Sequence, residues 1–79
     1  MERIYIIVEN DNGIITMDKQ YYKDIDRAKE VFQNKVSKVI KSVYGEIYHI
    51  ETHTDMYFVM KNDHNDIITK MIMPFELSE

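Results

Sequence analysis

The spacing of apolar residues changes twice along the chain, and each change marks a change of predicted element. In the segment Arg3 to Val8, Ile4, Ile6 and Val8 alternate with Tyr5 and Ile7, and this β-branched and aromatic run predicts a strand. Ile14 to Met17 is the second predicted strand. Asn10-Asp11-Asn12-Gly13 lies between them. Asn, Asp and Gly tolerate positive φ, so this tetrapeptide predicts a hairpin turn.

From Asp24 onward, apolar residues recur at steps of three and four, which is typical of an amphipathic helix. The apolar stripe consists of Ile25, Ala28, Val31, Phe32, Val36, Val39, Ile40 and Val43. Asp24 is the predicted N-cap, and Gly45 is predicted to end the helix in the left-handed conformation. We therefore expect one helix from about Asp24 to Val43.

After Gly45, apolar residues again recur at every second position, as they do in strands. Three further strands are predicted at Glu46 to His53, Met56 to Lys61 and Ile67 to Met73. Pro74 is expected to end the last strand and to leave Phe75 to Glu79 as a tail. The order ββαβββ predicts a single α+β domain over residues 1–79, with one helix packed on a mostly antiparallel sheet.

Composition narrows the protein class further. With 79 residues, 44% hydrophobic and 30% charged, the chain resembles an ordinary small globular protein. The absence of cysteine excludes disulfides, thiolate zinc sites and cysteine nucleophiles. The longest apolar runs, Ile4 to Val8 and Met56 to Met60, fall far short of the ~20 residues that span a bilayer. The N-terminus lacks the features of a signal peptide, so we expect a cytoplasmic protein, or a host-cytoplasmic one if phage-encoded.

The residues required for the common catalytic motifs are poorly placed. Ser37 and Ser42 lie in the predicted helix and Ser78 lies in the tail, so none stands on the strained turn of a nucleophilic serine. The two glycines are isolated and do not form a phosphate-binding loop. Fourteen acids leave paired-carboxylate chemistry open, but one helix on one sheet seldom forms the necessary cleft. We therefore expect no enzyme activity and no cofactor.

One strand carries potential metal ligands. His49, Glu51 and His53 alternate and are expected to project from one face of the sheet. Two imidazoles and a carboxylate suit zinc or iron. However, same-face neighbours on a strand lie ~6.6 Å apart, too far for all three to reach one ion. The prediction is therefore a solvated strand face without metal, and a metal-dependent protein remains a third hypothesis.

Formal charge is unevenly distributed. Residues 19–41 hold seven bases against three acids, giving +4, although the whole chain carries −4. Lys35, Lys38 and Lys41 are expected on the exposed side of the helix, where they form a second candidate surface for phosphate or an acidic partner. A pI near 5.3 and only two arginines argue against nucleic acid.

The strongest candidate surface follows from the two apolar faces of the predicted sheet, because a single helix covers only one. We expect the helix to cover the face bearing Ile4, Ile6, Val8, Met56, Phe58, Met60, Met71 and Met73. The other face would keep Tyr5, Ile7, Tyr57, Val59, Ile68 and Ile72, with Tyr48 or Ile47 beside them. An apolar face of this kind predicts an interaction surface for a target protein or for a second copy in a homodimer. The alternative is scattered surface residues, with Phe75 and Leu77 folded back over the sheet.

These observations favour a small non-enzymatic protein-binding module. A composition rich in Ile, Lys, Asn and Tyr and poor in Gly and Pro is typical of AT-rich coding sequence, as in phages and mobile elements. The functional hypothesis is therefore an inhibitor or modulator that occludes a host or defence protein, in an anti-CRISPR-like role. The alternative hypothesis is a small nucleic-acid-binding regulator that uses the basic helix face.

Overall fold

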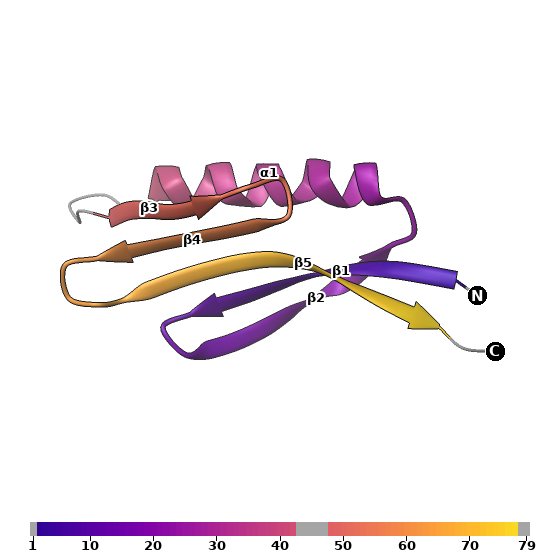
Figure 1. The fold of residues 1–79 in the computed structure, drawn as a ribbon, viewed down its shortest axis with the longest axis horizontal. Coiled ribbons are helices and arrows are strands. Elements are labelled where there is room, and N and C mark those ends of the chain that lie inside the picture. The colour runs from indigo at the N-terminus through magenta and orange to yellow at the C-terminus, as the bar shows by residue number, and fades with distance from the viewer. Residues whose placement is uncertain (1, 43–47, 78–79) are drawn as a thin grey trace.

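The computed structural model describes residues 2–42 and 48–77, which form five strands and one helix (Figure 1). In chain order these are β1 (Glu2–Asp11), β2 (Ile14–Tyr22), α1 (Ile25–Ser42), β3 (Tyr48–His53), β4 (Tyr57–Asn62) and β5 (Ile67–Leu77). The predicted α+β fold and its ββαβββ order are confirmed. The predicted helix end at Val43, the stop at Gly45 and the strand start at Glu46 lie outside the described residues.

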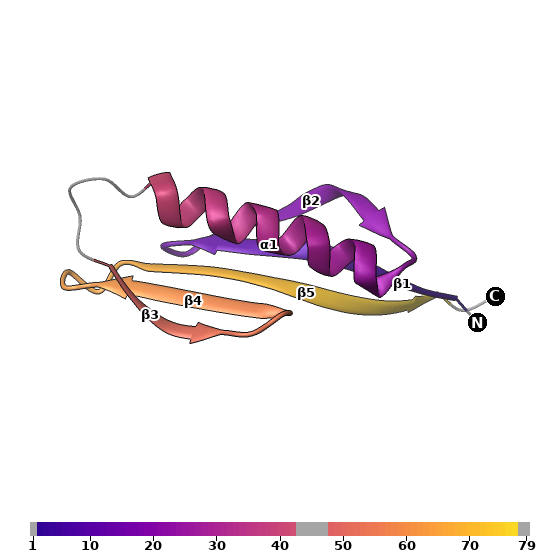
Figure 2. The same ribbon diagram turned by 90° about the horizontal axis from the view of Figure 1, so that it is seen from above.

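The strands form one antiparallel sheet in the order β2-β1-β5-β4-β3. The helix lies on one face of this sheet and runs along the strand direction (Figure 2). The start of β1 and the end of β5 extend together past the first turn of α1 (Figures 1 and 2). Beyond that turn, the two paired strands have no helix above them.

Two local predictions are confirmed by the backbone geometry. Asn12 and Gly13 have φ values of 57° and 97°, and they connect the paired residues Asp11 and Ile14 in a tight turn. The Asp24 carboxylate accepts a hydrogen bond from the backbone N–H of Asp26 at 2.9 Å, so Asp24 caps α1.

The prediction that Pro74 ends the last strand is wrong. Strand β5 continues to Leu77, and Pro74 lies opposite Tyr5 of β1. The pairing of β5 with β4 reaches only to Met71, so from Pro74 onward β5 has a strand neighbour on one side. Proline is tolerated at such an edge because its missing N–H removes no ladder bond on the open side.

The core lies between α1 and one face of the sheet, and this face differs in part from the predicted one. The buried residues are Ile7, Ala28, Phe32, Val36, Phe58, Met60 and Ile72. Phe58 and Met60 face the helix as predicted, and Met56 packs beside them. On β1 and β5 the prediction is wrong by one residue, because Ile7 and Ile72 are the buried pair, whereas Ile6 and Met73 pair on the opposite face.

Candidate interaction surface

The sheet face turned away from α1 carries exposed apolar side chains from strands β2, β4 and β5, and we call it the open sheet face. Cross-strand partners share a face, so the strand register identifies its members. Ile6, for example, pairs with Met73 on one side and with Tyr21 on the other. The exposed members are Ile15, Met17, Tyr21, Tyr57, Ile67, Met73, Phe75 and Leu77. Less exposed members lie among them, namely Ile4, Ile6, Val8, Val59 and Met71.

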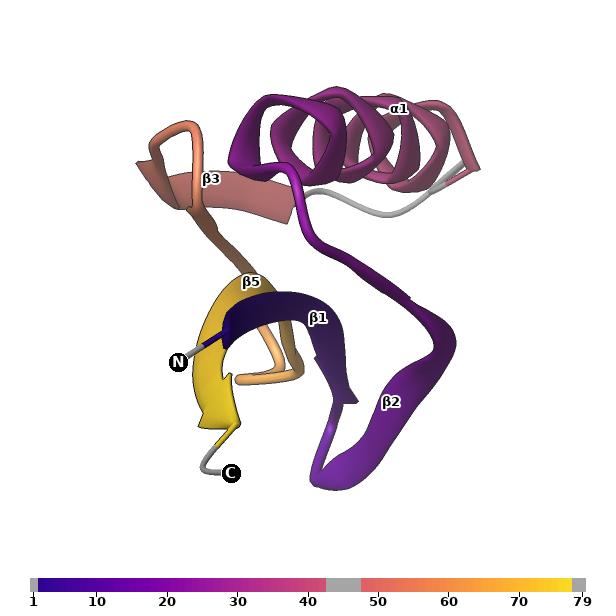
Figure 3. The ribbon, with the colours of Figure 1, turned by 90° about the vertical axis from the view of Figure 1, so that its right-hand side faces the viewer.

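The open sheet face is curved. Seen along the strands, β5, β1 and β2 form an arch that opens away from α1 (Figure 3). Ile4, on the inner side of this arch, is only 9% exposed although α1 lies on the other side of the sheet. The curvature therefore brings the apolar side chains of the three strands toward one another.

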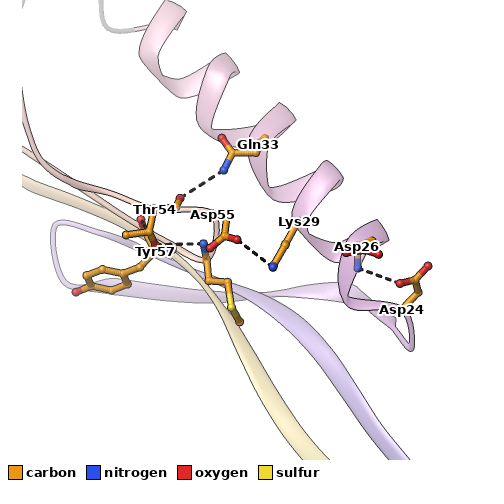
Figure 4. A network of polar contacts seen from close by, with 8 residues as sticks. Asp24, Asp26, Lys29, Gln33, Thr54, Asp55 and Tyr57 are labelled. Carbon is orange, nitrogen blue, oxygen red and sulfur yellow. Dashed lines mark hydrogen bonds and ion pairs between the residues drawn. The ribbon is translucent and has the colours of Figure 1, made fainter.

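Tyr57 is held at the start of β4 by the turn that precedes it. The Thr54 hydroxyl accepts hydrogen bonds from the backbone N–H groups of Met56 and Tyr57, at 3.2 and 3.0 Å. This turn is also tied to the helix, because Lys29 pairs with Asp55 at 2.9 Å and the Gln33 amide donates to the Thr54 carbonyl (Figure 4). The Asp55 carboxylate raises the pKa of Lys29 through this hydrogen bond. The Tyr57 ring points away from α1 (Figure 4).

Of the residues predicted for the interaction surface, two lie on the open sheet face. Tyr57 is exposed there, and Val59 is half-buried beside it. The prediction is wrong for the other four, which are Tyr5, Ile7, Tyr48 and Ile72. Ile7 and Ile72 belong to the buried core, and Tyr5 and Tyr48 pack against that core. Ile68 also packs there. For Tyr5, Ile7 and Ile72 the cause is the one-residue error in the facing of β1 and β5. Tyr48 lies on β3, and Ile47, the predicted alternative to Tyr48, lies outside the described residues.

The sequence prediction missed most of the open sheet face. The spacing of apolar residues on both sides of Pro74 could have indicated a longer strand. Every second residue continues to be apolar past the proline, at Met71, Met73, Phe75 and Leu77. Tyr21 gave no comparable signal. Strand β2 was expected to end at Met17, and three polar residues separate Met17 from Tyr21.

The predicted basic surface is only partly available. Lys38 and Lys41 are exposed, whereas Lys35 is half-buried beside the sheet. Its ammonium lies 3.6 Å from the Asp18 carboxylate and 3.9 Å from that of Glu9. The prediction that Lys35 lies on the exposed side of the helix is therefore wrong, and two acids offset its charge.

A lysine that the sequence did not single out completes this group. Lys70 lies on the helix side of β5, its side chain is only 10% exposed, and its ammonium binds Glu9 at 3.0 Å. Lys70, Lys35 and Lys38 line an open hollow of about 330 Å³ together with Glu9. Because Glu9 pairs with both Lys35 and Lys70, the hollow is not a free anion site.

The three candidate metal ligands do not share a face. The register shifts between Ile50 and Thr52, where Glu51 is an extra residue. His49 pairs with Lys61 and His53 pairs with Phe58, so the two histidines point to opposite faces. His49 instead contacts Asp63 at 3.1 Å, and His53 contacts Gln33 at 3.3 Å. The predicted common face is wrong, and within residues 2–42 and 48–77 no three His, Cys, Asp or Glu side chains are grouped to hold a metal.

Comparison with protein-family models, with curated proteins and with solved structures found no match. Among the residues that the structure describes, no helix combines the length and the apolar character needed to cross a membrane.

Proposed function

We propose that this protein is a non-enzymatic protein-binding module that acts through its open sheet face. The observation that supports this proposal is the set of eight exposed large apolar residues gathered on one side of the sheet. Contiguous apolar area of this kind is typical of protein interfaces, where aromatic residues and methionine are enriched. Tyr21 and Tyr57 add large contact area with a polar end that water solvates in the free protein.

A chain that acts by binding influences its partner by covering part of the partner's surface. We propose occlusion as the mode of action for the inhibitor or modulator role suggested by the composition. Hydrophobic packing in the centre of the face, with Tyr57 as one anchor, would supply most of the binding free energy.

Capture from a native-host lysate with tagged wild-type protein, Tyr57→Asp and Lys38→Glu tests the proposal. Tyr57→Asp places a charge in the apolar face and is expected to weaken binding by more than about 2 kcal/mol. Lys38→Glu changes an exposed residue outside that face and serves as the control.

The expected result is a stoichiometric protein partner that wild type and Lys38→Glu retain and Tyr57→Asp loses. Circular dichroism should show that both variants remain folded. Loss of the partner in Lys38→Glu alone, or co-purification of nucleic acid with wild type, would contradict the proposal and favour the basic helix face.

A further inference from the structure

We infer that the open sheet face binds a second copy of this chain, so that two sheets pack face to face in a two-fold symmetric dimer. This inference rests on the proposed function, because it names the partner that the face binds. A target protein that uses the same face would compete with the second copy.

The area of the face matches what one partner contributes to a stable interface. Its eight exposed apolar residues are between 36% and 66% exposed. Large apolar side chains at these exposures present together on the order of 800 Å², which equals one partner's share of a standard interface. This area also exceeds the roughly 300–600 Å² of the largest apolar patch on a typical monomer.

The distribution of charge permits the face to meet its own copy. Among the paired residues that the structure describes, the register places Glu2 and Lys61 on this face, each at one end of it. Glu2 lies beside Leu77, and Lys61 lies beside Ile67. No other paired residue of this face carries a formal charge, so among the described paired residues like-charge repulsion between two copies is confined to its ends.

The edges of the sheet are less suitable for self-association. Strands β2 and β3 form the two edges, and both have a register shift. In β2, the three polar residues at positions 18–20 occupy the space opposite a single residue of β1, Ile7. In β3, Glu51 is an extra residue that has no partner in the ladder with β4. Bulges and charged residues on an edge strand hinder the pairing of strands between molecules. The face is therefore the favoured surface for a second copy.

The small size of the core is a further reason for dimerisation. In the described part of the chain, seven buried residues form the core between α1 and the sheet. A small domain buries a low fraction of its surface, and association is a common means by which such domains gain stability. Contact between the exposed apolar side chains of two copies would form a second apolar cluster.

Sedimentation equilibrium and thermal unfolding of the wild-type chain test the inference. The expected mass is about 19 kDa, twice the chain mass of 9.5 kDa, with dissociation on dilution. The thermal midpoint is expected to rise with protein concentration, because dimerisation stabilises only the folded state.

Two matched variants locate the interface. Met73→Glu places a charge in the face at a residue that is 37% exposed, whereas Ile40→Glu makes a similar change at a residue of α1 that is 40% exposed. Met73→Glu is expected to weaken dimerisation at least about 30-fold, and Ile40→Glu is expected to leave it unchanged. If Met73→Glu does not fold, Ile15→Glu decides the question, because Ile15 is 66% exposed and contributes little to the monomer core.

A wild-type protein that remains monomeric at all concentrations would overturn the inference, as would a dimer that only Ile40→Glu dissociates. Neither result removes the proposed function by itself. A monomer that captures a foreign protein in a Tyr57-dependent manner would leave the proposed function intact while the dimer is rejected. A dimer whose Met73→Glu variant dissociates supports both.

Discussion

The pair formed by Glu9 and Lys70 predicts an unequal response to removal of either partner. The Lys70 side chain is 10% exposed and that of Glu9 is 33% exposed, and their charged groups lie 3.0 Å apart. Glu9→Gln leaves a buried ammonium beside a neutral amide, so we expect a loss of about 2 kcal/mol in unfolding free energy. Lys70→Met replaces the buried ammonium with an apolar group of similar size, and Glu9 stays partly solvated and near Lys35. The free energy of unfolding should therefore change by no more than about 1 kcal/mol.

Urea denaturation at one fixed protein concentration measures both changes. The concentration is fixed because the proposed dimer would add to the stability of the folded state. The slope of unfolding free energy against urea should be the same in wild type and in both variants. The opposite result is a loss in Lys70→Met equal to or larger than the loss in Glu9→Gln. It would show that the lysine stabilises the fold through interactions other than its pair with Glu9.

Three further predictions concern the core, the acid response and metal. Phe32→Ala, at a fully buried residue, should lower the free energy of unfolding measured in urea by about 3–5 kcal/mol. Lys38→Ala should change it by no more than about 0.5 kcal/mol. Equal losses in the two variants would show that another face of the helix is buried. Hydrogen bonds from the side chains of Asn62 and Asn12 lower the pKa of Asp66, so its contribution to stability is present above about pH 4 and is lost as the pH falls through the lowered value. Thermal midpoints measured across the acid range should therefore fall less steeply for Asp66→Asn than for wild type, and parallel curves would contradict this. Zinc or a chelator should leave the thermal midpoints of wild type and His49→Ala unchanged, because His49 and His53 lie on opposite faces of the sheet. One metal ion per chain in elemental analysis would contradict this prediction.

Local signals in the sequence were sufficient for the helix and the first turn. The three-and-four spacing around Phe32 and the cap at Asp24 specify α1, and Asn12-Gly13 supplies the positive φ that the hairpin requires. These features depend on residues that are close in sequence. They can therefore be predicted without knowing which strands are neighbours in the sheet.

The facing of β1 could not be predicted in the same way. Ile6 and Ile7 are equally apolar and equally suited to a strand, so alternation alone does not say which one meets the helix. The choice depends on long-range packing, in which Ile7 of β1 pairs with Ile72 of β5 beneath Phe32. The bulge at Glu51 could not be predicted either, because a bulge is defined by the register of β3 with β4, and the sequence of β3 alone does not contain that register.

The most direct test of the central claim uses the methionine methyl groups as reporters. Met17, Met71 and Met73 lie on the open sheet face, whereas Met56 and Met60 lie on the helix side of the sheet. Methyl resonances of carbon-13-labelled methionine would be recorded while the protein is diluted. If two copies meet through the open sheet face, the resonances of Met17, Met71 and Met73 shift together with the dimer fraction while that of the buried Met60 stays in place. Shifts confined to Met56 and Met60, or a dimer that forms without any change at Met17, Met71 and Met73, would contradict the claim that the open sheet face is the interaction surface.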